Sequence, residues 1–204
     1  KEIFRKNHIL GILKRFESEK TPLDIFLSDY FRKNKSVGSK DRKFIAETIY
    51  RLIRWMGLID YFIEKPITWE KRIDVLQILD IDKVQKDPNI PSHIKVSFPK
   101  KYFDLIEKDY GENKTLKFCF VSNHEAPTAI RANLLRISRD DLFLRFKEKY
   151  DVSKCKDSAQ GIRFHKKINF YSIGEFREGL FEMQDEGSQL IADLLSPKNN
   201  AQVL

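Results

Sequence analysis

The sequence predicts an α+β protein with more than one domain: an all-α helical bundle, a small α+β domain, and the first helix and strand of a Rossmann-like α/β domain. Apolar residues recur at helical spacing through residues 1–90, short strand-like runs follow residue 111, and residues 179–195 are typical of a strand running into a helix. The predicted domains span residues 1–90, 91–177 and 178–204. A 41% hydrophobic content supplies enough apolar side chains for real cores.

The helical front is predicted from apolar stripes and from residues that begin or end helices. Pro22 is expected to begin the second helix, and Ser39 to cap a long third helix with one apolar face. Gly57 is expected to break that helix, and two shorter helices follow. The predicted helices cover 3–17, a segment from residue 22, 41–56, 58–64 and 71–79.

The chain changes character after a predicted boundary at Asp87–Pro91. A helix from Pro99 is expected to end at Gly111, and a second helix, capped by Ser138, is expected between strands. Two strands, a helix and further extended pieces predict a sandwich with helices on one face of a sheet. The predicted helices are 99–110 and 139–150, and the extended segments are 116–121, 128–135, 161–164, 170–171 and 180–184.

The last residues are typical of the first helix and strand of an α/β enzyme domain. An apolar helix around Leu190–Leu195 is followed by Ser196, Pro197 and a strand expected at Gln202–Leu204. Because α/β enzymes bind ligands beyond the carboxyl ends of their strands, the pattern predicts the front part of an enzyme, ending before its chemistry.

The positive charge is concentrated near the N-terminus. Residues 1–54 hold fourteen Lys and Arg against seven Asp and Glu, of a net +8 for the whole chain. Cations beside a helix N-terminus are unfavourable for stability but suit phosphate binding, so this cluster predicts contact with a nucleic-acid backbone. The alternative is a solvated charged loop. The predicted contact residues are Arg32, Lys33, Lys35, Lys40, Arg42 and Lys43.

Cysteine and histidine positions predict no metal site. Cys119 is expected to be buried in a strand, and Cys155 to be an exposed residue between two lysines that could lower its thiol pKa. Neither has a second Cys or a His at metal-ligand spacing. No apolar run of about 18 residues and no secretory signal are found, so a cytoplasmic monomer without membrane contact is expected.

Three motifs, in this order and spacing, resemble the RsmB/Sun family of RNA 5-methylcytosine methyltransferases. They are Gly38–Ile45 (GSKDRKFI), Ala126–Asn133 (APTAIRAN) and Gln184–Gln189 (QDEGSQ). The resemblance covers nearly the whole chain. It implies a NusB-like RNA-binding domain, then an RRM-like domain, then the entry of a Rossmann-like methyltransferase domain.

The resemblance also implies an activity: S-adenosylmethionine-dependent methylation of cytosine C5 in RNA, with ribosomal RNA favoured over transfer RNA. Family members bind the cofactor on an Asp-x-Cys-Ala-x-Pro-Gly-Gly-Lys loop and use two cysteines, one after Pro and one after Thr. Cys119 follows Phe118 and Cys155 follows Lys154, and the loop is not in the sequence. No catalytic residue, no bound cofactor and no methyl transfer are therefore expected of this chain.

Further RNA-facing residues are predicted from the motifs. Arg131 and Asn133 match the family's Arg-x-Asn strand, with pairing to a neighbouring carboxylate as the alternative. A helix-capping role is the alternative for the Asp and Ser of the strand-to-helix junction. A third patch combines cations with Phe164 and His165 as stacking surfaces. The junction residues are Gln184, Asp185 and Ser188, and the cations of the patch are Arg163, Lys166 and Lys167.

Two other functions stay open. One is a non-catalytic RNA-binding adaptor with a NusB-like domain, which would use the same basic segment. The other is a protein-docking groove around Trp55, Tyr61, Phe62 and Trp69. RNA affinity through phosphates should fall steeply with ionic strength, whereas apolar docking should respond little.

Overall fold

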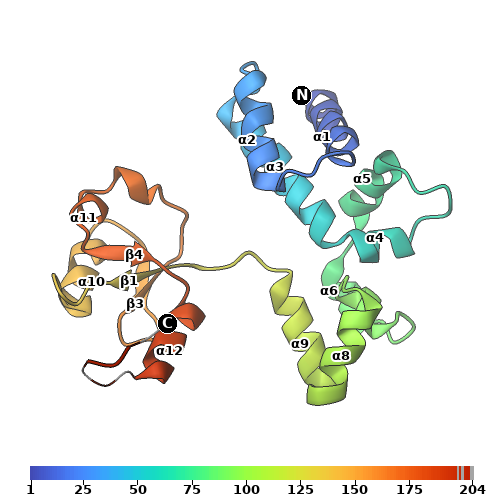
Figure 1. Ribbon diagram of the computed structural model, residues 1–204. Coiled ribbons are helices and arrows are strands. Elements are labelled where there is room, and N and C mark those ends of the chain that lie inside the picture. The colour runs from blue at the N-terminus through green and yellow to red at the C-terminus, as the bar shows by residue number, and fades with distance from the viewer. Residues whose placement is uncertain (197, 199, 203–204) are drawn as a thin grey trace. The chain divides into compact units, whose positions relative to one another are not determined.

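The computed structural model describes residues 1–196, 198 and 200–202. The chain forms two compact units, Lys1–His124 and Glu125–Leu204 (Figure 1). The predicted division into three domains, with boundaries near residues 90 and 177, stays a prediction.

The first unit is helical, as predicted. Its main core is built where α1 (Glu2–Phe16) packs against α3 (Ser39–Arg54), with Ile12, Leu13, Ile45, Ile49 and Leu52 fully buried. These residues lie at helical spacing on the facing sides of the two helices, so burial of one apolar stripe on each explains the pairing. The helices are α1 Glu2–Phe16, α2 Leu23–Lys33, α3 Ser39–Arg54, α4 Met56–Tyr61, α5 Trp69–Ile78, α6 Ile81–Lys86, α7 Ser92–Lys95, α8 Lys100–Tyr110 and α9 Glu112–Ser122.

Three predictions in this unit were wrong. The expected strand Leu116–Val121 is the second half of α9, because Thr115 and Cys119, one helical turn apart, form its buried side. Ser39 is the first residue of α3 rather than its cap, and Gly38 takes the cap position without a side-chain hydrogen bond. Gly57 lies inside α4, and the break between α3 and α4 is at Trp55.

The second unit is a four-stranded antiparallel sheet, in which β2 (Val152–Lys154), β3 (Gly161–Phe164), β1 (Thr128–Ala132) and β4 (Phe181–Met183) are paired in that order. Figure 1 labels β1, β3 and β4. The predicted cap is confirmed, since Ser138 Oγ accepts the Asp141 backbone N–H at the start of α10. The expected extended segment Phe170–Tyr171 is instead a 3-10 turn held by Asn169, and β2 was not predicted. The elements are β1 Thr128–Ala132, α10 Arg139–Lys147, β2 Val152–Lys154, β3 Gly161–Phe164, η1 Phe170–Ser172, α11 Gly174–Arg177, β4 Phe181–Met183 and α12 Glu186–Leu195.

The two faces of this sheet differ. Ile130, Ile162 and Phe164 point into a core closed by α10 and rich in edge-to-face aromatic pairs around Phe146 and Phe181. Because side chains alternate along a strand, the residues between them point to the opposite face. That face carries Ala129 and Arg131 of β1 and Gly161 and Arg163 of β3, and α12 packs against it beside β1.

The end of the chain is only partly described. The predicted apolar helix is α12, and its cap position is Asp185. The predicted strand at Gln202–Leu204 falls partly on residues 203 and 204, which lie outside the described residues, and Gln202 is not in a strand. Among the helices that the structure describes, none is both long enough and apolar enough to cross a membrane.

Candidate nucleic-acid interface

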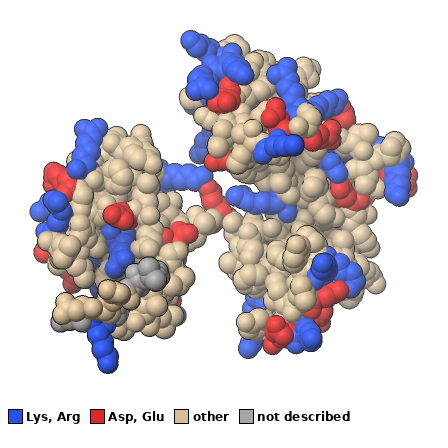
Figure 2. Space-filling model, in the orientation of Figure 1, with Lys and Arg blue, Asp and Glu red and all other residues tan. Residues whose placement is uncertain are grey.

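The basic segment of the first unit surrounds the start of α3. Lys33, Lys35 and Lys40 are exposed, and within the described part of the chain none of them forms an ion pair. Arg32 is exposed too, but pairs with Asp29 at 2.6 Å, and Lys43 lies 3.8 Å from Glu47. Figure 2 shows basic side chains gathered at this end of the first unit. Three lysines are therefore free to meet an external anion.

Arg42 differs from its neighbours because its side chain is bound within the protein. Its Nε donates to the Val37 carbonyl oxygen at 2.7 Å, and its guanidinium lies 5.9 Å from the ring centre of Phe31. Val37 itself is fully buried. Arg42 therefore closes the loop between α2 and α3, which fixes where the exposed lysines stand.

The N-terminus of α3 has no side-chain cap. Gly38 occupies the cap position, so the first backbone N–H groups of this 16-residue helix receive no side-chain acceptor. The positive end of a helix favours anions, and Lys40 in its first turn adds a full charge. The acidic residue of the same turn, Asp41, is paired with Arg5 at 2.7 Å, so the helix end and the unpaired lysines together favour an anion here.

In the second unit, the structure places Arg163 beside three other predicted residues, in two neighbouring cavities. Arg163 of β3 and Asp185 at the start of α12 line the same cavity of about 340 Å³. Arg163 also lines a neighbouring cavity of about 310 Å³ with Lys166 and Lys167. Its guanidinium therefore stands between an acidic junction and a basic surface. The first cavity is lined by Ala126, Pro127, Ala129, Asp157, Arg163, Asp185, Glu186, Gly187 and Leu190.

Glu186, which sequence reasoning missed, orients this arginine. Glu186 Oε2 accepts from Arg163 Nη2 at 3.0 Å, while Oε1 accepts the backbone N–H groups of Asp157 at 2.6 Å and Ser158 at 3.2 Å. The Asp157 N–H, assisted by Ser158 and Arg163, lowers the pKa of the Glu186 carboxyl below its ordinary value. The sequence did offer a signal for Glu186, because an acidic residue in the first turn of a helix is favoured by the positive end of that helix. Arg163 Nε is buried without a partner among the described residues.

Gln189 fastens α12 to the sheet beneath this site. Its side chain is 2% exposed, and its Oε1 accepts from Ser158 Oγ at 2.6 Å. Its Nε2 donates to the carbonyl oxygens of Gln184 at 2.8 Å and Ile130 at 3.3 Å. Gln184 thus contributes a backbone acceptor to the junction, and Ser188 is exposed outside the cavity lining. Asp185 is at the cap position but makes no side-chain cap bond.

The predicted Arg131 and Asn133 lie elsewhere on the unit. Arg131 Nε donates to Gln160 Oε1 at 2.6 Å, so its partner is an amide and not the carboxylate considered from the sequence. Asn133 Nδ2 donates to the Gly179 carbonyl oxygen at 2.9 Å, and its Oδ1 accepts the Leu135 N–H. Both side chains hold loops at the ends of strands, and neither lines the two cavities beside Arg163.

Of the two predicted stacking residues in the third patch, Phe164 was wrong, and His165 stays a prediction. Phe164 is 3% exposed and belongs to the core, so its ring is not offered to a base. His165 is exposed, with Nε2 at 3.0 Å from Ser153 Oγ. Lys166 is exposed, and Lys167 pairs with Glu125.

Both cysteines are protected. Cys155 is 6% exposed instead of exposed, and burial, reinforced by the negative charge of Glu186, raises the pKa of its thiol. Cys119 is buried as predicted, although in a helix, and burial raises its thiol pKa as well. In residues 1–196, 198 and 200–202, no three His, Cys, Asp or Glu side chains are grouped as a metal site requires.

The predicted aromatic groove does not form as one exposed surface. Tyr61 and Phe62 are 48% and 45% exposed, but Trp55 is 5% exposed. Trp69 donates its indole N–H to Glu17 Oε1 at 2.6 Å and lies under the guanidinium of Arg72. The docking hypothesis therefore loses the two tryptophans as exposed anchors.

Comparisons with known proteins identify related chains. Residues 98–171 match the family model "Methyltr_RsmF/B-like, ferredoxin-like domain". A stretch of 115 residues is 29% identical to ribosomal RNA small subunit methyltransferase B from Proteus mirabilis (strain HI4320), covering 55% of this chain and 24% of that relative. This chain thus spans about a quarter of the relative's length.

Two solved structures are similar to the chain. One is the crystal structure of PH0851, with a TM-score of 0.48 and 16% identity over 93% of this chain and 54% of that chain. The other is a methyltransferase homolog protein from Pyrococcus horikoshii, with a TM-score of 0.45 and 23% identity over 52% of this chain and 35% of that chain.

Proposed function

We propose a function from the premise that this chain is a relative of the RsmB/RsmF-like methyltransferases, with their ferredoxin-like domain and an N-terminal helical region. It is the RNA-binding and substrate-positioning part of an S-adenosylmethionine-dependent methyltransferase that acts on cytosine C5 of ribosomal RNA. The observation that carries the proposal is the group of three exposed lysines, free of ion pairs among the described residues, at the uncapped start of α3.

The basic segment supplies affinity without reading sequence. Each Lys or Arg that neutralises a phosphate releases bound counterions, so Lys33, Lys35 and Lys40 would account for about three phosphate contacts. Arg32 and Lys43 reach the same region once their exposed partners, Asp29 and Glu47, are exchanged for phosphate. Arg42 acts indirectly by holding the loop.

Arg163 is the proposed RNA contact of the second unit. Glu186 holds its guanidinium in one orientation, and a pre-oriented donor loses less freedom on binding than a free side chain does. Asp185, Gln184 and Ser188 belong to the same proposed junction. Arg131 and Asn133 stay predicted contacts, although their side chains already bond to Gln160 and to the Gly179 carbonyl oxygen. Positioning of this kind converts binding into rate for a reaction carried out at a neighbouring site.

Neither cysteine of this chain fits the role of the catalytic nucleophile. S-adenosylmethionine, when bound, supplies the methyl group that becomes attached to C5 of cytosine. The two thiols of this chain are buried with raised pKa values, so neither presents the thiolate that adds to a pyrimidine ring. These residues therefore serve recognition, and the transfer is assigned to none of them.

Charge-removal variants test the proposal. Replacing Lys33, Lys35 and Lys40 together by Ala should reduce the slope of log affinity against log salt by about 2 for a single-stranded RNA, because three phosphate contacts are lost. The matched control replaces Lys101, Lys108 and Lys117 of α8 and α9, which are also exposed. Equal losses in both variants would contradict the assigned segment. Fragments of small-subunit ribosomal RNA should bind more tightly than transfer RNA.

The burial of both thiols also favours a second candidate, a non-catalytic RNA-binding adaptor. Sequencing the gene beyond the codon for Leu204 separates the two. A cofactor loop followed by Pro-Cys and Thr-Cys motifs would support the methyltransferase, whereas a stop codon at that point would support the adaptor.

A further inference from the structure

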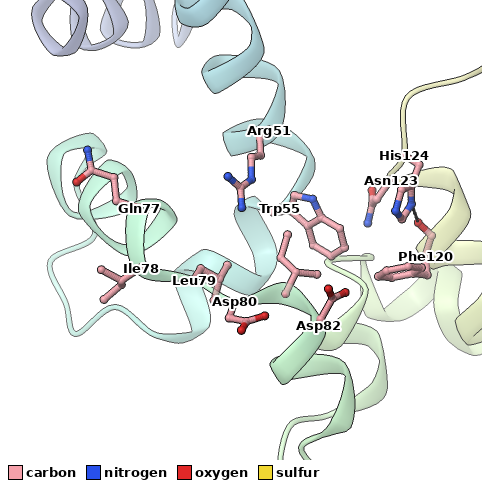
Figure 3. Close-up of a pocket in the computed structure, with 11 residues that line it drawn as sticks. Arg51, Trp55, Gln77, Ile78, Leu79, Asp80, Asp82, Phe120, Asn123 and His124 are labelled. Carbon is pink, nitrogen blue, oxygen red and sulfur yellow. Dashed lines mark hydrogen bonds between the residues drawn. The ribbon is translucent and has the colours of Figure 1, made fainter. Parts of the chain in front are cut away.

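A cavity of about 490 Å³ in the first unit is not used by the function proposed above. Figure 3 shows three parts of the chain converging on it: Arg51 of α3 with Trp55 just after that helix, Asp80 before α6 with Asp82 inside it, and Phe120 of α9 with His124 just after it. Ligand pockets in proteins have volumes of about 300–1,000 Å³, so one nucleotide or a small peptide segment would fit. Gln77, Ile78, Leu79, Ile81 and Asn123 complete the lining.

One side of the cavity is aromatic. The Phe120 ring centre lies 6.0 Å from that of Trp55 and 4.7 Å from that of His124. His124 Nδ1 lies 2.8 Å from the Phe120 carbonyl oxygen, which fixes the imidazole in place. Trp55 is 5% exposed and supports the other two rings from below, so Phe120 and His124 offer the accessible aromatic surface. Unstacked RNA bases bind proteins on such rings.

The charged residues of the cavity are of both signs. Arg51 forms no ion pair with any described residue, so its guanidinium can accept an external anion. Asp80 Oδ1 accepts the Lys83 backbone N–H at 3.1 Å and so caps α6. The Asp82 carboxylate has no hydrogen-bond partner among the described residues. Two carboxylates beside one cation disfavour a run of phosphates but suit a ligand with one phosphate and several N–H donors.

We propose that this cavity binds a single unpaired guanine nucleotide of an RNA, with the base against Phe120 and His124, its N1–H and N2–H donors on Asp82, and its phosphate on Arg51. A carboxylate accepts two parallel hydrogen bonds, and guanine is the base whose pairing edge offers two adjacent donors. Uracil presents carbonyl oxygens on both sides of its one N–H, so the same carboxylate repels it. The inference rests on the RNA-binding function proposed above, and adds a base-specific contact to it.

The two tryptophans allow a direct test by NMR with the full chain. Guanosine 5′-monophosphate should shift the indole N–H signal of Trp55, while that of Trp69, bound to Glu17 and outside the cavity, serves as the internal reference. Asp82→Asn should weaken binding about tenfold or more, in line with the loss of one bidentate base contact. Arg51→Ala should also weaken it. Lys86→Ala, which removes a charge outside the cavity lining, should leave binding unchanged.

Other outcomes overturn the inference. Equal shifts with uridine 5′-monophosphate, unchanged binding by Asp82→Asn, or no Trp55 shift at millimolar nucleotide would each contradict a guanine site. A Trp55 shift produced by an apolar peptide but not by nucleotide would assign the cavity to a protein partner. The proposed function fails separately: if RNA binds and responds to the α3 lysines while guanine nucleotide does not bind, only the cavity assignment is wrong.

Discussion

Arg163 of β3 and Glu186 of α12 form an ion pair of 3.0 Å that links the sheet to the start of the last helix. The Glu186 side chain is 14% exposed and the Arg163 side chain 39%, so the pair is anchored at its acidic end and open at its basic end. A carboxylate that also accepts two backbone N–H groups is a rigid support, and the guanidinium beside it can still meet a ligand.

Glu186→Gln should destabilise the second unit at neutral pH. The neutral amide weakens three charge-assisted contacts, for which a loss of about 1–3 kcal/mol in the free energy of unfolding is expected. Urea unfolding of the variant measures this loss in the free energy of unfolding. Glu182→Gln serves as the control because Glu182 is exposed on β4. A loss no larger than that of the control would contradict the anchoring role.

The same carboxyl predicts a pH dependence. The pKa of Glu186 is lowered in the fold, so its stabilisation is present above the ordinary carboxyl pKa and is lost as pH falls through the lowered value. The stability difference between the parent chain and Glu186→Gln should therefore shrink on acidification. Unfolding curves at pH 7 and in the acid range check this, and a difference independent of pH would contradict it.

Gly161→Ala should be strongly unfavourable. A Cβ at this position would lie 2.7 Å from both Cβ and Sγ of Cys155, and 3.1 Å from Gln189 Oε1. Such overpacking costs about 1–3 kcal/mol. Gly187→Ala meets nothing within 4 Å and lies in α12, so it should be neutral or stabilising. Thermal unfolding of the two variants compares them directly, and equal melting temperatures would refute the tight contact.

The thiols should react slowly in the native protein. Burial raises the pKa of both Cys119 and Cys155, which lowers the thiolate fraction and blocks access. A colorimetric disulfide reagent at pH 7.5 should react with both thiols rapidly only after denaturant is added. Rapid labelling of either thiol under native conditions would contradict the burial of that cysteine.

Sequence periodicity predicted most of the helices and the main strands, because one-sided apolar burial determines both patterns. Part of the helix Glu112–Ser122 was predicted as a strand because Phe118–Val121 consists of residues that favour strands. The two buried residues, Thr115 and Cys119, are instead one helical turn apart and lie on one face of the helix. Cys155 was expected in solvent because its neighbours are lysines, but pairing of β2 with β3 turns it toward Gly161.

The candidate site was predicted less completely than the fold. The sequence identified Arg163 and Asp185, which line one cavity, from motifs and charge. Glu186 and Gln189 were missed because their roles depend on partners 23 and 59 residues away along the chain. Non-local partners of this kind are set by tertiary packing, which no local spacing reveals.

The most direct test of the account is a salt titration of RNA binding by the full chain. Affinity for a single-stranded fragment of small-subunit ribosomal RNA should fall linearly on a log–log plot, with a slope of about −2 or steeper from the three α3 lysines alone. A slope near zero, or no binding at low salt, would contradict an RNA-binding function for this protein.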